Sequence, residues 1–502
     1  MTVLARGGDP PDPPDRPSGA RRFDVVVAGA GPAGSIAALV LARGGARVAL
    51  VDKATFPRDK ACGDLVGPRG VGLLSDLAVA VPDAGQGADL LAVGPSGHRS
   101  RLPAFPGRRY PGHGVVVPRI GLDDALRAAA LQAGAEPVRG RVSGVDRDGG
   151  GPAPDRPVRA LLTSDGQRLE ADWFIAADGA LSPVARLAGL LDPDAALWGF
   201  AIRAYVPAEV PLPLLVLLDA APWRIYPGYG WLFPGEAGQA NVGIGIGMGT
   251  RRHAASLRAD LARFCAMLRR TGDLTPGAEH GEVTGGWLRM GGTGTPAAAG
   301  NVLLAGDAAG LINPLQGEGI GPAMVSARLA AECLLGPASA GAAAAYSEAV
   351  ADTFGRYMPG AAALQAALLR RPRLASGAVR LLTAPGVSRV VAGTWSLYWN
   401  GLVDGASPRP AAWAGAAVQQ VASRLGRRWP AVRQLAAAPG EPGAAAAPGG
   451  PGAAGLGGAE PGRAEPGSRA EPGGRAEPGG RAEPGEASAA PEFTPRGQAA
   501  PD

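Results

Sequence analysis

Two glycine-rich segments, far apart in the chain, carry the residues best suited to binding a dinucleotide. The first, Phe23–Gly34, has the pattern of an apolar strand, a glycine turn and the start of a helix. Gly29 would permit the tight turn, and Gly31 would let the backbone approach a pyrophosphate. Gly34 would let the helix pack close to the strand, and Ala33, in the same helix start, belongs to the predicted contact set.

An acidic residue follows where such a fingerprint requires one. Asp52 ends the second strand, 18 residues after Gly34, where a carboxylate would bind the adenosine ribose. A carboxylate here disfavours a 2′-phosphate, so the ligand is expected to be FAD or NAD rather than NADP. The predicted β-α-β unit has strands over 23–28 and 47–51 and a helix over 32–44. The alternative is a glycine cluster that serves only packing.

The second segment separates FAD from NAD. Val302–Gly310 has the pattern of an apolar strand that ends in a glycine–aspartate corner, and a helix is expected to begin near Gly319. Asp307 could accept a hydrogen bond from a ribose or ribityl hydroxyl. The glycines before the helix would let backbone N–H groups approach an anion or a polar ring edge. The two segments therefore suggest two halves of one bound flavin.

Composition bounds the class of protein. The chain has 502 residues and a charge of +5, from 49 Lys+Arg against 44 Asp+Glu, an excess too small to indicate nucleic-acid binding. Its three cysteines are widely spaced, so we expect neither a disulfide framework nor a metal site. There is no apolar stretch typical of a signal peptide or a transmembrane helix. We therefore expect a cytoplasmic protein, with any membrane contact peripheral.

Changes in composition along the chain predict its domain organisation. The ends are expected to be disordered, since residues 438–502 repeat short Glu-Pro-Gly units that contain no core-forming residues. The predicted parts are a disordered segment 1–20, a discontinuous FAD-binding domain (21–84, 115–197 and 291–337), a β-rich substrate domain (85–114 and 198–290), a helical C-terminal region (338–437) and the tail 438–502. Helices are expected over 122–133 and 253–271.

The residues Ala177-Asp178-Gly179 and Gly306-Asp307 are additional to an ordinary NAD site. With them, the sequence resembles the flavoprotein superfamily that includes aromatic hydroxylases. The resemblance implies an α/β fold: a Rossmann-like FAD/NAD(P)-binding domain with an inserted antiparallel β-sheet substrate domain and a C-terminal helical segment. It also implies that Asp307 contacts the ribityl chain of FAD, and that Gly319 and Ile320 present backbone to the isoalloxazine.

Two further cofactor contacts follow from the same resemblance. Arg119 matches an arginine that precedes a helix and turns toward the cofactor in such proteins. Val142, on the next strand, matches the position that usually offers a backbone contact to adenine.

Three motifs point to a narrower family. They are Phe56–Asp64, the segment Gly228–Pro234 followed by Asn241–Gly245, and Asn313–Gly319. Over residues 21–425 the chain resembles the geranylgeranyl reductase family, which saturates isolated double bonds in polyprenyl chains. The actinobacterial branch that reduces the menaquinone tail is the most similar in layout. One departure is Leu65, where that branch more often has a glycine, and this weakens the case for an identical substrate.

The resemblance implies a catalytic role for Cys62. The family places a cysteine near the flavin on the loop after the ribose-binding strand, which makes Cys62 and Gly63 predicted cofactor contacts. Reduction of an unactivated alkene needs a hydride, a proton and an apolar slot that excludes water. A thiol with a pKa of about 8.5 is mostly protonated at neutral pH, so Cys62 could supply or relay the proton. The alternative is that Cys62 is a small buried hydrophobic residue.

An aromatic strand provides the predicted substrate contacts. Tyr229, Trp231 and Phe233 alternate along the chain, so they face one side of a strand. We expect Tyr229 and Trp231 to form a wall for a prenyl chain, and Phe233 to pack in the core. The alternative for all three is sheet packing.

The C-terminal region combines arginines with aromatic residues. Arginines 370, 371 and 373, with the aromatic residues Trp395, Tyr398, Trp399 and Trp413, suggest contact with an anionic membrane surface. The alternative is that these residues only pack a helix against the rest of the protein.

No second dinucleotide fingerprint appears, so the electron donor is expected to be NAD(P)H bound transiently, or a protein or quinol. Two other functions stay open: a flavin monooxygenase or halogenase acting on an aromatic compound, and a non-catalytic flavin redox protein.

Overall fold

The computed structural model describes residues 21–82, 86–87, 89–103, 111–148, 156–219, 228–248, 257–337, 341–355 and 357–388. Structural statements below concern these residues. The predicted disordered ends, 1–20 and 438–502, lie outside them, as does the part of the predicted helical region after residue 388.

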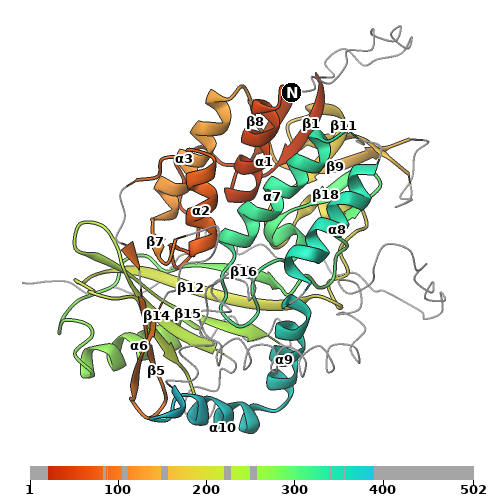
Figure 1. The fold of residues 1–502 in the computed structure, drawn as a ribbon. Coiled ribbons are helices and arrows are strands. Elements are labelled where there is room, and N and C mark those ends of the chain that lie inside the picture. The colour runs from red at the N-terminus through yellow and green to blue at the C-terminus, as the bar shows by residue number, and fades with distance from the viewer. Residues whose placement is uncertain are drawn as a thin grey trace, which may run out of the picture. The chain divides into compact units, whose positions relative to one another are not determined.

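The first sheet carries the dinucleotide fingerprint (Figure 1). Its strand β1 (Arg21–Ala28) is apolar and buried from Val25 to Ala28, and it pairs in parallel with a strand on each side. The parallel order is β18 (Val302–Leu304), β11 (Arg168–Ala176), β1, β2 (Val48–Asp52) and β8 (Glu136–Arg139). The short strand β17 (Ala298–Ala299) pairs antiparallel with β18, and β10 (Val158–Thr163) and β9 (Val142–Arg147) extend antiparallel from β11. Strands buried on both faces explain the continuous apolar runs in the sequence.

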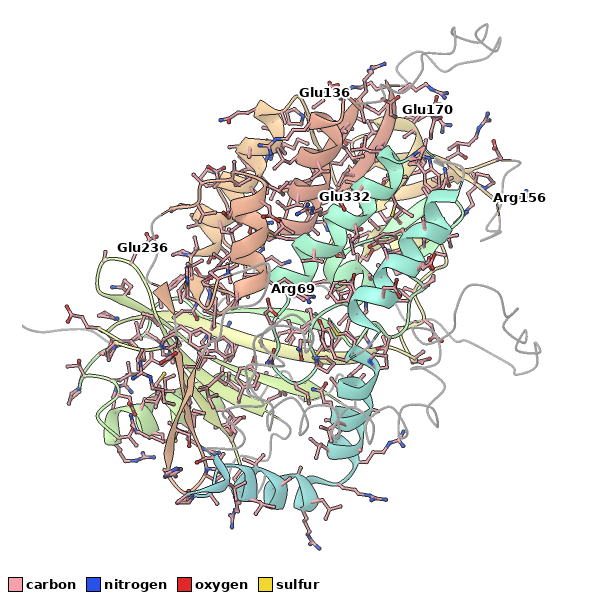
Figure 2. All side chains as sticks on the ribbon, viewed as in Figure 1. Arg69, Glu136, Arg156, Glu170, Glu236 and Glu332 are labelled. Atoms are coloured by element: carbon pink, nitrogen blue, oxygen red, sulfur yellow. The ribbon has the colours of Figure 1, made fainter. Side chains whose placement is uncertain are left out.

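Helices rich in alanine and leucine bury both the sheet and one another. Helix α1 (Pro32–Arg43) packs against α7 (Ile320–Leu335) and α3 (Arg119–Gln132), and α7 also contacts α2 (Pro68–Asp76). The expected helix over 122–133 begins three residues earlier, because Pro118 provides a helix N-cap and Arg119 is the first helical residue. Charged side chains such as those of Glu136, Glu236 and Glu332 are exposed (Figure 2).

The second sheet has seven strands in the order β16 (Thr284–Met290), β12 (Leu197–Pro207), β15 (Gln239–Met248), β14 (Gly228–Pro234), β13 (Leu214–Leu217), β5 (Asp89–Val93) and β6 (Arg99–Pro103). The prediction of an antiparallel sheet is wrong at one pair, since β13 and β5 run parallel. The β5–β6 hairpin comes from an earlier part of the chain, so no tight turn fixes its direction relative to β13.

One face of this sheet is covered by helix α6 (Leu257–Arg270), whose bounds fall inside the expected helix over 253–271; residues 253–256 lie outside the described residues. Phe264 and Leu261 on α6 pack against Val242 and Ile244 of β15. The ring of Phe264 lies against Gly230, where an added Cβ would come within 2.4 Å of Phe264 Cζ. The other face of the sheet is thereby left to form the site.

A small third sheet was not expected from the sequence. Strands β3 (Leu65–Val66) and β4 (Gln86–Gly87) both pair with β7 (Gly114–Val116). This sheet joins strands from the predicted FAD-binding domain and from the predicted substrate domain. The boundaries between these two domains stay predictions. The sheet fixes the chain just after the Cys62 loop.

Within the described residues, α7 is followed along the chain by the helices α8 (Ala342–Phe354), α9 (Met358–Arg370) and α10 (Pro372–Leu382). The buried hydroxyl of Tyr346 on α8 donates to the carbonyl of Leu304, 2.7 Å away, and anchors this helix to β18. Within the residues that the structure describes, none of the helices has the length and apolar character needed to span a bilayer.

Candidate functional site

Two of the three glycines of the first fingerprint occupy positions that no larger residue fits. Gly29 has φ +98°, and a Cβ there would lie 2.3 Å from the carbonyl oxygen of Ala177. A Cβ on Gly34 would lie 1.6 Å from the carbonyl oxygen of Gly29, so this glycine permits the close contact of helix and strand. Gly31 differs, because a Cβ there would meet only Arg58 Nη2, at 3.7 Å. The space before Gly31 is open, as a pyrophosphate would require.

Asp52 is held rigidly at the carboxyl end of β2. Its two oxygens accept hydrogen bonds from the backbone N–H groups of Ala30 (2.7 Å) and Ala54 (2.8 Å). The N–H of Gly140 donates to the carbonyl of Asp52 at 2.9 Å, which brings the start of β9 close to this strand end. Val142 lies two residues after Gly140 and is half-buried. The ribose contact of Asp52 and the adenine contact of Val142 stay predictions.

A cluster of cations lies beside the open space at Gly31. Arg119 forms two hydrogen bonds of 2.7 Å with Asp123, whose side chain is inaccessible to solvent, and Arg58 Nη1 lies 2.8 Å from the same carboxylate. Burial alone would lower the pKa of Arg119, but the Asp123 carboxylate outweighs it and raises that pKa. Two guanidinium groups share one carboxylate, and Lys60 lines the adjoining cavity. The residual positive charge suits an anionic diphosphate such as that of FAD.

The second fingerprint forms a compact corner. Gly306–Ala309 is one 3-10 turn, and the backbone N–H of Gly306 donates to Ser326 Oγ at 2.9 Å. Arg289 on β16 is fully buried and donates to the carbonyl oxygens of Asp307 (3.2 Å) and Ala308. Burial lowers the pKa of Arg289 to about 10, so it stays charged at neutral pH. A buried cation therefore fixes the turn from behind and leaves the Asp307 carboxylate facing the cavity.

Helix α7 begins directly beside that carboxylate. Gly319 is its N-cap and Ile320 its first residue, as the sequence predicted. A Cβ added to Gly319 would lie 3.5 Å from Asp307 Oδ1. The predicted cofactor contacts Asp307 and Gly319 thus lie next to one another, although the Asn313–Gly317 loop separates the 3-10 turn from helix α7 along the chain.

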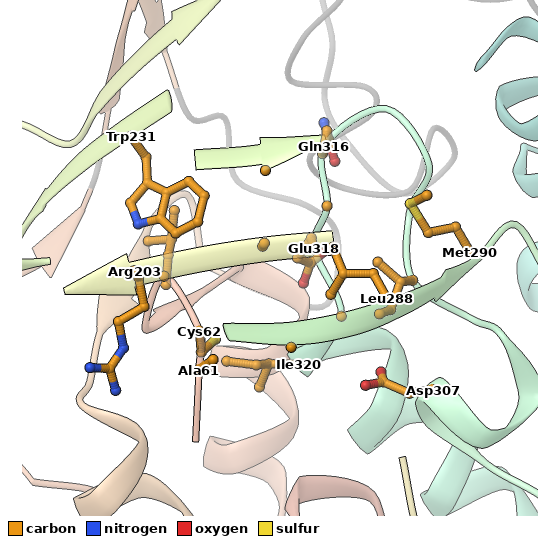
Figure 3. A pocket seen from close by; sticks show the side chains of 18 of the residues that line it. Ala61, Cys62, Arg203, Trp231, Leu288, Met290, Asp307, Gln316, Glu318 and Ile320 are labelled. Atoms are coloured by element: carbon orange, nitrogen blue, oxygen red, sulfur yellow. The ribbon is translucent and has the colours of Figure 1, made fainter. Parts of the chain in front are cut away.

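A cavity of about 370 Å³ joins the two fingerprints to the second sheet (Figure 3). The predicted site residues that line it are Gly31, Ala33, Cys62, Gly63, Arg119, Tyr229, Trp231, Asp307, Gly319 and Ile320. Gly29, Gly34, Asp52 and Val142 do not line it. Its remaining wall is mainly apolar and extends to helices α9 and α10, with Leu215, Leu288, Leu368 and Val379 among the lining residues.

Cys62 reaches this cavity as a thiol. Burial raises the pKa of the Cys62 thiol above its ordinary value, although the positive charge of Arg119 acts in the opposite direction. The side chain therefore holds its proton at neutral pH. A protonated thiol on the wall of an apolar slot could supply a proton where water is excluded.

The aromatic residues of β14 form one face, as their alternation predicted. The ring centroids of Tyr229 and Trp231 are 6.0 Å apart, and those of Trp231 and Phe233 are 6.3 Å apart. Phe233 packs in the core, as expected, and its ring also lines the cavity. The hydroxyl of Tyr229 donates to the carbonyl of Gln316 at 2.5 Å and ties the strand to the loop before α7.

Sequence reasoning missed two polar residues of the cavity wall. Glu318 places its carboxyl group against the backbone of Gly67 and Gly321, and burial raises its pKa to about 7. Gln365 on α9 is 4 % exposed, and its Oε1 atom has no hydrogen-bond partner. Only the glycines on either side of Glu318 could have drawn attention to it. The sequence around Gln365 gives no such signal, because it is an ordinary alanine-rich helix.

One family model matches the N-terminal part of the chain. Residues 22–196 match the family model described as an FAD binding domain. The chain is 36% identical over 329 residues to a menaquinone reductase of Mycolicibacterium smegmatis, which covers 62% of this chain and 76% of the relative. It is 31% identical over 337 residues to digeranylgeranylglycerophospholipid reductase 1 of Methanopyrus kandleri, over 62% of this chain and 80% of the relative.

Solved structures share the fold. A geranylgeranyl bacteriochlorophyll reductase-like protein from Thermoplasma acidophilum superposes with a TM-score of 0.63 at 22% identity, covering 81% of this chain and 100% of that one. A flavin-dependent brominase superposes with a TM-score of 0.61 at 17% identity, covering 81% of this chain and 100% of that one. The α/β fold class with an FAD-binding domain of the aromatic-hydroxylase type is confirmed.

Proposed function

Because the chain belongs to the geranylgeranyl reductase family of FAD-dependent oxidoreductases, we propose that it saturates isolated double bonds of a polyprenyl chain. The substrate is a geranylgeranyl lipid or a menaquinone-type tail. The observation that carries this proposal is the single cavity that runs from the two cofactor fingerprints, past Cys62 and Trp231, to an apolar end at α9 and α10.

In this proposal some residues of the chain bind the cofactor and the substrate, and Cys62 donates a proton. FAD, when bound and reduced, supplies the hydride. Gly31, Arg58 and Arg119 would hold its diphosphate, and Asp307 its ribityl chain. The apolar wall excludes water from the alkene, and the rings of Tyr229 and Trp231 would align the prenyl chain. Cys62 Sγ carries the proton that completes the reduction.

An anaerobic assay tests the function directly. Reduced protein is mixed with menaquinone or with a geranylgeranyl lipid, and the product is analysed by mass spectrometry. A gain of two hydrogens is expected. Oxygen uptake with an aromatic compound, and no reduction of either lipid, would favour a monooxygenase instead. Bound flavin with no substrate-dependent reoxidation would favour a non-catalytic redox protein.

The role of Cys62 can be tested separately. Replacing the thiol by an apolar group removes the proton, so Cys62→Ala is expected to lower turnover by about 100-fold while FAD content holds. Cys62→Ser is expected to retain part of the activity, because a hydroxyl can still relay a proton. Near-native rates in both variants at full FAD occupancy would contradict the proton role.

A membrane contact would explain how a long lipid reaches the slot. Leu374, Leu381 and Val387 are 62%, 62% and 37% exposed, and we call them the α10 apolar surface. Arg370, Arg371 and Arg373 are exposed nearby, and Val379 on the same helix lines the cavity. We propose that this surface rests on an anionic membrane on its cytoplasmic side. The predicted contributions of Trp395, Tyr398, Trp399 and Trp413 lie outside the described residues.

The electron donor is part of the same proposal. Among the described residues we identify one dinucleotide turn, at Gly29–Gly34, which the proposed FAD contacts would occupy. We propose that NAD(P)H binds only transiently, or that a protein or quinol donates. Stopped-flow reduction of the flavin by NADH, by NADPH and by a reduced quinol distinguishes these sources.

A further inference from the structure

We propose that Asn241 is a positioning residue that connects the aromatic wall to the Cys62 loop. It would hold the indole ring of Trp231, which contacts the prenyl chain, at a fixed distance from Cys62, which donates the proton. The inference rests on the function proposed above and assigns a role to a side chain that does not line the cavity. Asn241 lies on β15, between its partners Phe233 on β14 and Tyr205 on β12, and is 0 % exposed.

The amide of Asn241 contacts both sides of the proposed reaction site. Its Oδ1 atom accepts a hydrogen bond of 2.8 Å from the indole Nε1 of Trp231. Its Nδ2 atom donates to the carbonyl oxygen of Cys62 at 2.8 Å and to Asp64 Oδ2 at 2.7 Å. Because an indole N–H can only donate, the amide has only one orientation that satisfies all three bonds.

The Trp231 ring has little freedom beyond this bond. A Cβ added to Gly243 would lie 2.2 Å from Trp231 Cζ2, and one added to Gly63 would lie 3.4 Å from Trp231 Nε1. The ring therefore rests on the glycine of one strand and against the glycine of the Cys62 loop. The hydrogen bond to Asn241 sets the direction in which the indole edge points.

The Cys62 loop needs such support because its backbone is strained. Asp64 has φ +64°, a left-handed backbone conformation that residues other than glycine adopt uncommonly. Its side chain is 1 % exposed and also accepts a bond of 2.6 Å from the hydroxyl of Tyr205. On the other side, the N–H of Val117 donates to the carbonyl of Asp64 at 2.8 Å. Asn241 supplies two of the bonds that hold this loop.

The charged groups around Asp64 agree with this arrangement. Burial raises the pKa of Asp64, while the Tyr205 hydroxyl, the Asn241 amide and the guanidinium groups of Arg203 and Arg119 oppose that rise. Removing the amide would leave a buried carboxyl group short of a donor, and an indole N–H short of an acceptor. Both losses would relax the Cys62 loop and the ring of Trp231 together.

Three variants test the inference. Asn241→Leu keeps the approximate volume and removes all three bonds. Asn241→Asp keeps an acceptor for Trp231 but removes the donor to Cys62, and it decides the question if Asn241→Leu does not fold. Asn301→Leu is the matched control, because Asn301 also binds backbone through its amide, at Val158 and Asp172, away from the cavity.

The first measurement does not depend on turnover. Alkylation of Cys62 by iodoacetamide, followed by peptide mass spectrometry, reports how readily the loop opens. Losing a buried hydrogen bond corresponds to about a tenfold change in such an equilibrium, so both Asn241 variants should be alkylated about tenfold faster or more. The Asn301→Leu rate should match the wild type. Equal rates at Cys62 in all four proteins would overturn the inference.

The second measurement separates positioning from folding. With FAD content held, kcat should fall about tenfold in Asn241→Leu while KM changes less, because the bound chain is displaced from the proton donor. Trp231→Phe, which removes only the indole donor, should be non-additive with Asn241→Leu. Additive effects on kcat would contradict the coupling. If the wild type itself reduces no prenyl lipid, the proposed function fails, and the alkylation result still decides the role of Asn241.

Discussion

At the scale of the single residue, the protonation of Glu318 should respond to pH in the neutral range. Burial raises its pKa from 4.5 to about 7, so the folded chain keeps this proton after the unfolded chain has lost it. The folded state therefore binds more protons between pH 4.5 and 7, and its stability falls as the pH rises through that window. Above pH 7 the penalty is complete.

Glu318→Gln should remove this dependence. A neutral amide pays no cost for burying a charge, so the apoprotein variant should be more stable than the wild type at pH 8, by about 2–3 kcal/mol. At pH 4.5 the two proteins should differ little. Urea denaturation at both pH values is the measurement, with the exposed Glu236→Gln as control. A constant difference between variant and wild type across this range would contradict the raised pKa.

The sequence was sufficient to predict those residues whose role comes from their own backbone conformation. Gly29, Gly31 and Gly34 stand where a turn needs them, and their spacing alone predicted this. Asn241 and Glu318 could not be assigned, because their contacts come from segments far away in the chain. Arg119 was recognised as a cavity residue only through resemblance, and its partner Asp123 was not expected to bind it.

At the scale of the element, the fingerprint turn depends on the contact between α1 and β1. A Cβ on Gly34 would lie 1.6 Å from a backbone oxygen, which cannot move without breaking the turn. Gly34→Ala should therefore destabilise the protein by about 2–5 kcal/mol and abolish FAD retention. Flavin absorbance after gel filtration, together with urea denaturation, measures both effects.

A matched glycine gives the opposite result. Gly377 lies on α10, is exposed, and has nothing near its Cα that an added methyl group would meet. Gly377→Ala should stabilise the protein by about 0.5–1 kcal/mol, because alanine favours a helix. If both substitutions destabilised equally, the effect at Gly34 would not be one of close packing.

Elements that are local in sequence were predicted well. The β-α-β unit, the helix before Ala133 and the helix from Ile320 follow from apolar periodicity and helix caps. The parallel pairing of β5 with β13 and the third sheet of β3, β7 and β4 were missed. Such pairings join distant segments, and alternation along one strand carries no information about the direction of its partner.

For the whole molecule, the α10 apolar surface should decide whether the protein sediments with lipid. Leu374→Ser with Leu381→Ser removes two exposed leucines, so binding to anionic vesicles should fall about tenfold or more. Leu181→Ser is the control, because Leu181 is 52% exposed and lies on the loop before α4 (Pro183–Leu187). Liposome co-sedimentation at low and high salt measures the effect. A wild type that stays in the supernatant would rule out this surface.

The order of strands in the first sheet has a consequence for synthesis on the ribosome. β18 pairs with β11, yet five of the seven strands of the second sheet (β12, β13, β14, β15 and β16) are translated between them. A nascent chain that ends before β18 has the first fingerprint but lacks Asp307 and Gly319, and it leaves Phe174–Ala176 of β11 without the partner strand β18. The cofactor cradle can close only after the second sheet has left the exit tunnel. Until then the chain must protect that edge from pairing with another copy.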